Sequence, residues 1–116
     1  MSEDKRGVTL RLHDILREIA ELKDETARLS YGTFSETWLL RRACERALEI
    51  ISEASRHLPA ELKDTEPDIP WRQIAGIGNV LRHDYENISS RITWDIIVNH
   101  LDPLEDAVRR LLAAVE

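Results

Sequence analysis

The sequence predicts an all-α protein, an antiparallel bundle of four helices, on three observations. Apolar residues recur at intervals of three and four along most of the 116 residues. Aromatic residues make up only 5% of the chain, and no segment alternates as an exposed strand would. The length fits a single domain. We expect a flexible N-terminal tail at residues 1–7 and one helical domain at residues 8–116.

The first helix is predicted over residues 8–29, where the apolar residues form one stripe along about six turns. Gly32 follows it and is suited to the left-handed turn that often ends a helix. Thr33 and Glu36 have the spacing of a capping box. We therefore expect a second helix from there to about His57. Its apolar stripe comprises Leu39, Leu40, Ala43, Ala47, Leu48, Ile50, Ile51 and Ala54.

Residues 58–69 lack apolar periodicity, contain two prolines and predict a long connecting loop. A third helix is predicted over residues 71–82, although each of its two glycines costs about 1 kcal/mol relative to alanine. Close approach of another backbone or of a ligand would account for them. A polar break at residues 87–90 precedes the last helix. Its apolar residues alternate steps of four and three, as in helix–helix contacts, and comprise Ile97, Leu101, Leu104, Val108, Leu111 and Val115. Pro103 lies inside that helix and should kink it near residues 99–102.

The composition narrows the classes of function. No stretch approaches the roughly 20 apolar residues of a membrane span, and the charged N-terminus lacks the apolar segment of a signal peptide. Cys44 is the single cysteine, so no internal disulfide can form and we expect a cytoplasmic protein. The net charge of −6 disfavours a general nucleic-acid coat but leaves room for one local basic site. His13, His57 and His100 have no partners at metal-ligand spacing, so we expect no metal and no cofactor.

The end of the third helix gathers groups that suit phosphodiester chemistry. Residues four apart share a helix face, so Asn79 projects with His83, and Gly78 with Arg82. Because helical side chains lean toward the N-terminus, Arg82 can reach back over the bare surface at Gly78. Tyr85 lies just beyond. Arginine binds phosphate oxygens bidentately, and histidine moves a proton near neutral pH. The alternative is an ordinary helix end without a catalytic role, because the helix macrodipole favours a histidine there.

Most of the chain resembles the HepT-like toxins of the HEPN superfamily. The similar segments are ALEIISEASRHLP (47–59), IPWRQIAGIGNVLRHDYENIS (69–89) and ITWDIIVNHLDPLEDAVRRLL (92–112). The resemblance implies a HEPN-type bundle that forms a homodimer, and a metal-independent ribonuclease acting at the shared cleft on single-stranded RNA or tRNA. It also implies a partner, a minimal nucleotidyltransferase antitoxin that can transfer AMP to the motif tyrosine.

The family's signature is Arg, four residues, His, one residue, Tyr. Its histidine and tyrosine map onto His83, the proton-transfer residue, and Tyr85, the regulatory AMP acceptor. Asn79 and Asp84 also match common family residues. The signature arginine maps onto Gly78, and this departure matters because that arginine steadies the scissile phosphate in the family.

Two hypotheses follow from the departure. Either Arg82 takes over from one turn later, or the protein is a non-catalytic HEPN interaction module that dimerises and binds the nucleotidyltransferase. A helix-turn-helix DNA-binding protein is disfavoured because no helix carries a basic, exposed recognition face. Arg41, Arg42 and Arg46 either add positive potential to a dimer cleft or are ordinary solvated charges. Further candidates for the cleft are Glu53, which matches the family's helix-two glutamate, Asp84 and Trp71.

Overall fold

The structure, a computed structural model, describes the backbone of residues 2–82 and 87–116 and the side chains within residues 5–82 and 90–116. In this part of the chain the regular structure is helical and no strand occurs, so the predicted all-α class is confirmed. The helices are α1 (Ser2–Thr26), α2 (Tyr31–Glu36), α3 (Trp38–Arg56), α4 (Ala60–Lys63), α5 (Trp71–Arg82), α6 (Asn87–Asn99) and α7 (Leu101–Val115).

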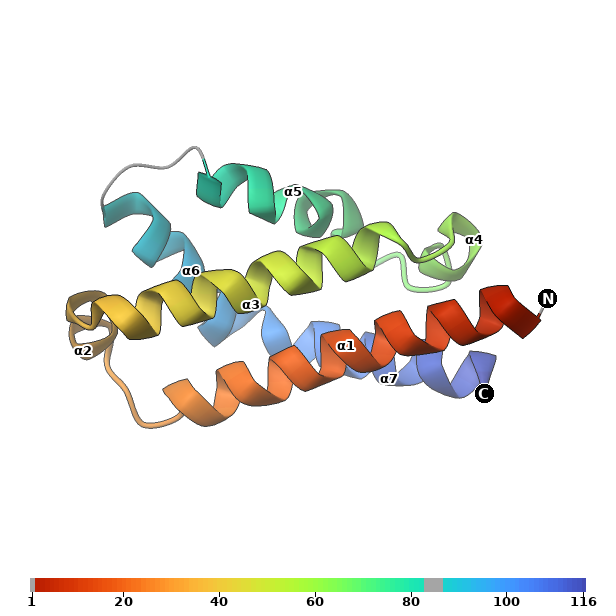
Figure 1. Ribbon diagram of the computed structural model, residues 1–116, viewed down its shortest axis with the longest axis horizontal. Coiled ribbons are helices and arrows are strands. Elements are labelled where there is room, and N and C mark those ends of the chain that lie inside the picture. Colours follow the sequence, from red (N-terminus) through yellow and green to blue (C-terminus); the bar gives the residue numbers. More distant parts are fainter. Residues whose placement is uncertain (1, 83–86) are drawn as a thin grey trace.

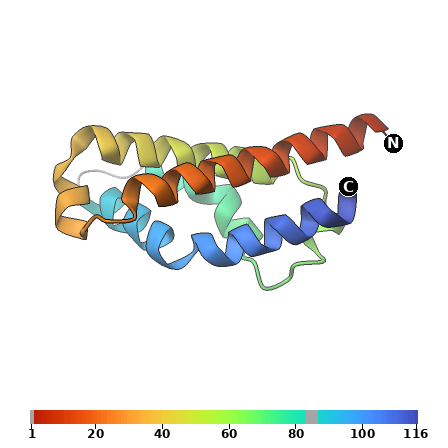
Figure 2. The same cartoon turned by 90° about the horizontal axis from the view of Figure 1, so that it is seen from below.

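The long helices form an antiparallel bundle of four arms (Figure 1). The first arm is α1, and α3 returns beside it. The third arm, α5, packs on α3, and the fourth consists of α6 and α7, with α7 packed on α1. Because the arms alternate in direction, the two termini lie at the same end of the molecule (Figures 1 and 2).

The apolar stripes predicted for the first and last helices form the core of the bundle. The stripe of the second helix is buried only in its later part, since Leu39 and Ala43 near the start of α3 are exposed. The main core residues are, from α1, Leu12, Ile15, Ile19 and Leu22; from α3, Cys44, Ala47, Leu48, Ile51 and Ala54; and from α7, Leu101, Leu104, Ala107, Val108 and Leu111.

The start of the second arm differs from the prediction. Ser30 is the N-cap of the short helix α2, and its Oγ accepts a hydrogen bond from the Thr33 N–H at 3.1 Å. Gly32 therefore lies inside α2 instead of ending a helix, and the predicted capping box at Thr33 and Glu36 is wrong. Serine is a strong N-cap residue, and it acts here one turn earlier than expected. Thr37, in an extended conformation, separates α2 from α3.

An aromatic cluster fastens α2 to α6 at one end of the bundle. Phe34 is fully buried, and its ring centroid lies 5.1 Å from that of Trp94. The Tyr31 ring also meets Trp94, at 6.3 Å, and its hydroxyl lies 3.0 Å from Ser90 Oγ. The Arg91 guanidinium stacks over the same tyrosine ring at 4.1 Å from its centroid. These contacts give the six-residue α2 the tertiary support that so short a helix requires.

The boundaries of α1 differ from those expected. The helix begins at Ser2 and so includes residues that the sequence analysis assigned to a tail. Most charged residues of this segment are good helix formers, which favours the longer helix. At the other end α1 stops at Thr26, whose carbonyl accepts a turn hydrogen bond from the Leu29 N–H at 3.1 Å.

The later connections also contain more helix than predicted. The loop at residues 58–69 includes the single turn α4, and α6 begins at Asn87, inside the expected polar break. The fourth arm breaks completely at His100, within the region where a kink was predicted. Pro103 is the third residue of α7, where the missing N–H needs no helical partner. Proline therefore helps to start α7 and does not interrupt it.

We predict that Phe34→Ala lowers the free energy of unfolding by about 3–5 kcal/mol, since it leaves a cavity at the α2–α6 contact. Leu10→Ala is the control, because Leu10 is exposed on α1 and its truncation should change stability by less than about 0.5 kcal/mol. Urea denaturation followed by circular dichroism measures both changes. Equal, small losses in the two variants would contradict a structural role for α2.

Candidate functional site

Two hollows open between α3 and α5. One, of about 300 Å³, is lined by residues of α1, α3 and α5, and the other, of about 330 Å³, lies near the C-terminal end of α5. They share Arg46, Glu49 and Arg82, and we call them together the α3–α5 trough. Its charged residues are Arg11, Asp14, Arg42, Glu45, Arg46, Glu49, Glu53, Arg56 and Arg82.

Arg82 folds back over Gly78, as the helix geometry predicts. A Cβ atom built on Gly78 would lie 3.4 Å from Arg82 Nη1, an ordinary van der Waals contact. Gly78 is buried, and the Arg82 guanidinium covers this position, to which the resemblance assigns the signature arginine. A Cβ atom on Gly76 would meet nothing within 4 Å. Neighbouring backbone therefore does not require either glycine.

The arginines of the trough differ in how far carboxylates neutralise them. Arg42 pairs with Glu45 at 3.0 Å, and Arg46 lies 3.6 Å from Glu49. Arg82 makes no ion pair with any residue that the structure describes. An unpaired guanidinium keeps its hydrogen-bond donors available for an anion such as a phosphate.

Two hydrogen bonds to one carbonyl set the position of α5 on α3. Ser52 Oγ and Arg56 Nη1 each donate to the Ala75 carbonyl oxygen at 2.9 Å. Ser52 is almost fully buried, so this bond satisfies a polar group inside the interface. The sequence analysis missed both residues. The available signal was the pair Ser52 and Ser55, which stand three residues apart on the buried face of α3.

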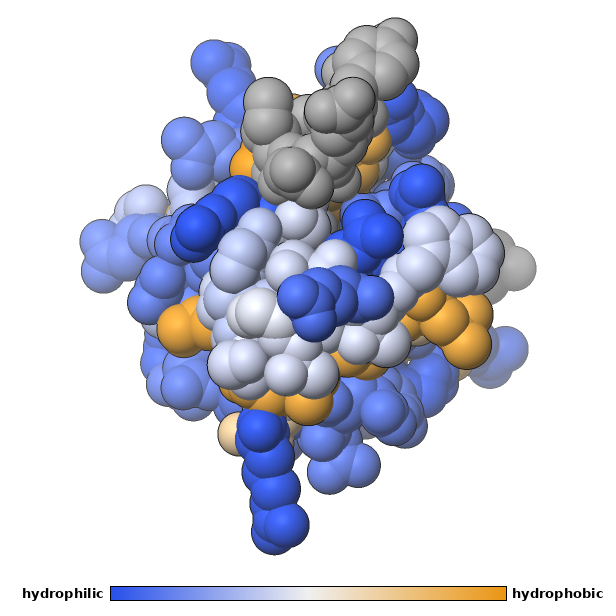
Figure 3. Space-filling view, turned by 90° about the vertical axis from the view of Figure 1, so that its left-hand side faces the viewer, coloured by the Kyte–Doolittle hydropathy of each residue, from blue (hydrophilic) through white to orange (hydrophobic). Residues whose placement is uncertain are grey.

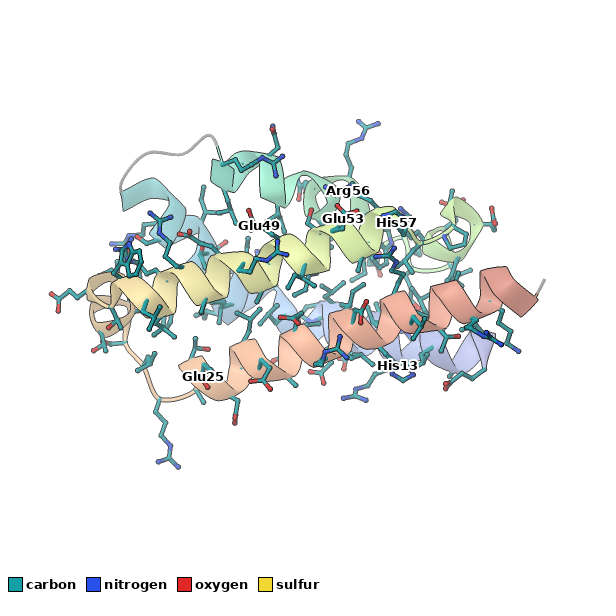
Figure 4. The ribbon with its side chains drawn as sticks, viewed as in Figure 1. His13, Glu25, Glu49, Glu53, Arg56 and His57 are labelled. Atoms are coloured by element: carbon teal, nitrogen blue, oxygen red, sulfur yellow. The ribbon has the colours of Figure 1, made fainter. Side chains whose placement is uncertain are left out.

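Glu53 lines the trough, but two neighbouring side chains already contact its carboxylate. Its carboxylate accepts a hydrogen bond from Arg56 and lies 2.8 Å from His57 Nε2. Figure 4 shows Glu49, Glu53 and Arg56 along the part of α3 that faces α5. The His57 hydrogen bond, followed by the one from Arg56, lowers the pKa of Glu53. A carboxylate with a lowered pKa stays ionised at neutral pH, so Glu53 acts as a fixed negative charge instead of a proton donor.

The remaining predicted site residues fall in three places. Trp71 is at the opposite end of α5 from Arg82, and its indole N–H donates to the carbonyls of Lys63 and Glu66, both at 3.1 Å. The structure therefore does not bring Trp71 to the trough. Asn79 is exposed on α5 and is not among the residues that line the trough. His83, Asp84 and Tyr85 follow Arg82 directly and lie outside the described residues.

The three other histidines and Cys44 are not among the residues that line the trough. His13, His57 and His100 are exposed, each beside one carboxylate. Residues 5–82 and 90–116 contain no group of three side chains able to hold a metal ion. None of the helices in the described range is both long and apolar enough to cross a membrane. Cys44 is buried, and burial, with Glu25 and Glu45 nearby, raises the pKa of its thiol to about 11.

Comparison with known proteins extends the resemblance to the whole bundle. The family described as Ribonuclease HepT-like matches residues 15–111, from α1 through α7. The chain belongs to the HepT-like ribonuclease family. No solved structure matches it.

Relatives of this HepT-like protein come from bacteria and archaea. A protein of Caldanaerobacter subterraneus subsp. tengcongensis, named as a candidate RNase, is 36% identical over 101 residues, which are 87% of this chain and 90% of that protein. One from Methanocaldococcus jannaschii with the same description is 33% identical, over 90% of this chain and 95% of its own. A protein of Thermococcus cleftensis, named as a probable ribonuclease HepT, is 31% identical over 86% of this chain and 91% of its own.

Proposed function

We propose that this HepT-like protein is a cytoplasmic ribonuclease toxin that cleaves single-stranded RNA or tRNA without a metal ion. The observation that carries the proposal is the Arg82 guanidinium, which lies over Gly78 and faces a trough that Arg42 and Arg46 also line. Although the chain has a net charge of −6, these arginines form a local site at which a phosphate can bind. The family match supports RNA as the source of that phosphate.

The proposed cleavage uses the nucleophile that RNA itself carries. The 2′-hydroxyl oxygen attacks the adjacent phosphorus, and the bond from phosphorus to the 5′-oxygen breaks. The hydroxyl proton leaves to a base, and the departing oxygen takes a proton from an acid. His83 performs one of these two transfers, since an imidazole exchanges protons near neutral pH. Arg82 stabilises the charge that develops on the phosphorane oxygens. Asn79, one turn before His83, assists from the helix face that it shares with that histidine.

The alternative is a non-catalytic interaction module. Its support is specific, because glycine stands at the position that the resemblance assigns to the signature arginine. In this alternative Arg82 only covers the glycine, and the protein dimerises and binds its nucleotidyltransferase partner without cutting RNA. Glu53, held by Arg56 and His57, fits both alternatives as a structural charge near the cleft.

We predict that Arg82→Ala lowers the rate of RNA cleavage about as much as His83→Ala, by roughly 10²–10³-fold, as for other groups that stabilise a transition state. Arg82→Lys should recover only part of the activity, because an ammonium cannot make the bidentate contact. Gly78→Arg should be neutral or harmful, since Arg82 occupies that space. Arg72→Ala is the matched control, an exposed arginine at the far end of α5. Cleavage of one labelled single-stranded RNA by purified proteins, with a chelator present, measures all five.

The interaction-module alternative predicts the reverse pattern. The parent protein would then not cleave, Arg82→Ala would change nothing, and Gly78→Arg would gain activity. Full activity in Arg82→Ala, with the protein folded, would rule out the role proposed for that arginine.

We propose a homodimer whose two active sites face a shared cleft. Trp38, at 61% exposure, and Val80 are large apolar residues open to solvent. Figure 3 shows hydrophobic residues, in orange, reaching the surface at the end of the molecule where α2 lies. Apolar surface of this kind is typical of protein interfaces. We predict a mass by light scattering of about twice the 13.4 kDa of one chain, and dissociation by Val80→Glu but not by Leu10→Glu. A parent protein that stays at the mass of one chain would contradict the shared cleft.

We propose that a minimal nucleotidyltransferase antitoxin neutralises the protein by transferring AMP to Tyr85. The added phosphodiester would carry a negative charge close to Arg82, so it would block substrate phosphate by bulk and by charge. The chain has only one other tyrosine, Tyr31, whose hydroxyl lies against Ser90.

With the cognate nucleotidyltransferase, ATP and magnesium, mass spectrometry should find AMP on the peptide that contains Tyr85. The Tyr85→Phe variant should take up none, because Tyr31 is held at the α2–α6 contact. AMP found on another residue would rule out this role for Tyr85. So would the absence of AMP when the same nucleotidyltransferase preparation modifies another substrate.

A further inference from the structure

A second hollow lies on another face of α3, where that helix meets α1. Its volume is about 450 Å³, and it lies beside the N-terminal half of α3, where α1 and α3 diverge in Figure 1. We call it the α1–α3 groove. It is lined by Glu18, Glu21, Leu22 and Glu25 from α1 and by Thr37, Leu39, Leu40, Ala43, Cys44 and Ala47 from the start of α3 and the residue before it.

The floor of this groove is apolar surface that the fold leaves uncovered. Sequence periodicity predicts Leu39 and Ala43 in a buried stripe, yet Leu39 is 69% exposed and Ala43 is also exposed. The two small residues Ala43 and Ala47 make the floor concave, because their side chains end at Cβ. Leaving such a surface in water costs free energy that a partner's apolar side chains would recover.

The wall formed by α1 is acidic. Glu18, Glu21 and Glu25 are spaced by three and four residues and so share one helix face, as their common place in the groove shows. None of the three forms an ion pair with another residue in the described part of the chain. Figure 4 shows Glu25 on the half of α1 nearest α2. The negative charge of Glu25 acts on Cys44, which lines the floor of the groove, and adds to the effect of burial in raising the pKa of that thiol. Like charges at this spacing repel one another in the free protein.

A second copy of the chain does not fit this groove. A symmetric contact would pair groove with groove, so two acidic walls would be brought into one interface with no basic residue of the groove to neutralise them. A partner with positive charge removes the repulsion. Between residues 37 and 47, α3 rises by about 15 Å, which matches a helix of about three turns.

We propose that the α1–α3 groove binds an amphipathic helix of a partner protein. The helix lays an apolar ridge on Leu40, Ala43 and Ala47 and places lysine or arginine side chains against Glu18, Glu21 and Glu25. This is recognition of a helix in a groove, with anchors at intervals of three and four residues. The proposal is independent of RNA cleavage, because the α3–α5 trough lies on a different face of α3.

The probe for this site is a fluorescein-labelled peptide of about 14 residues that contains leucine on one helical face and lysine on the other. A peptide with glutamate in place of lysine is its counterpart. Fluorescence anisotropy at physiological salt should show binding of the basic peptide and none of the acidic one. Amide chemical-shift changes should map to residues 18–25 and 37–47. Absence of binding, or shifts confined to other helices, would overturn the proposal.

Two variants test the two halves of the contact. The double variant Glu21→Lys, Glu25→Lys should weaken binding by about tenfold or more, a loss of about 1.4 kcal/mol. Its control, Glu61→Lys with Asp64→Lys, changes the net charge equally at exposed positions on and just after α4 and should keep affinity within about twofold. Ala43→Trp fills the floor from an exposed position and should also weaken binding.

If the Glu21→Lys, Glu25→Lys variant and its control lost the same affinity for the basic peptide, the effect would be one of net charge alone. That result would overturn the proposal. Unchanged binding by Ala43→Trp would overturn it as well. The rate of RNA cleavage by both groove variants should equal that of the parent, so failure of this proposal can be told apart from failure of the proposed activity.

Discussion

The packing of α3 against α1 on one face and α5 on another is the constraint on which the rest of the structure depends. The register of α5 is held by the Ala75 carbonyl, which accepts hydrogen bonds from Ser52 and Arg56. That register places Gly78 and Arg82 beside Arg46 and so creates the trough. On the other face, the N-terminal half of α3 is less covered by α1, which leaves the groove. One helix therefore supplies a wall to both candidate binding surfaces.

The two surfaces on α3 differ in charge, although the chain as a whole is acidic. The α3–α5 trough is lined by five arginines and four acidic residues. Arg42 and Arg46 have glutamate partners within their own helix, whereas Arg82 stands over a glycine. Paired arginines position a polyanion weakly because their charge is shared, while an unpaired one binds it more strongly. The groove instead carries carboxylates that form no ion pair with any residue that the structure describes. Under the two proposals above, this separation of charge would let one small bundle attract a nucleic acid and a basic protein segment at different places.

The helix that carries the candidate site is weak by itself. Gly76 and Gly78 each reduce helix propensity by about 1 kcal/mol, and neither is required by neighbouring backbone. Tertiary contacts with α3 therefore maintain α5. At its other end, the hydrogen bonds of Trp71 to Lys63 and Glu66 tie the helix to the preceding connection. A helix stabilised from outside keeps its Arg82 end in register only while the α3 contact is intact.

Sequence alone determined the helical class, the buried stripes of α1 and α7, the limits of α5 and the return of Arg82 over Gly78, because 3.6-residue periodicity and side-chain direction are local properties. It misplaced the start of the second arm, because Ser30 and Thr33 both have good capping chemistry and the burial of Phe34 against Trp94 decides between them. It also placed Leu39 in the core, whereas this side chain is exposed. That position depends on the angle at which α1 lies against α3, which only the tertiary packing of the chain determines.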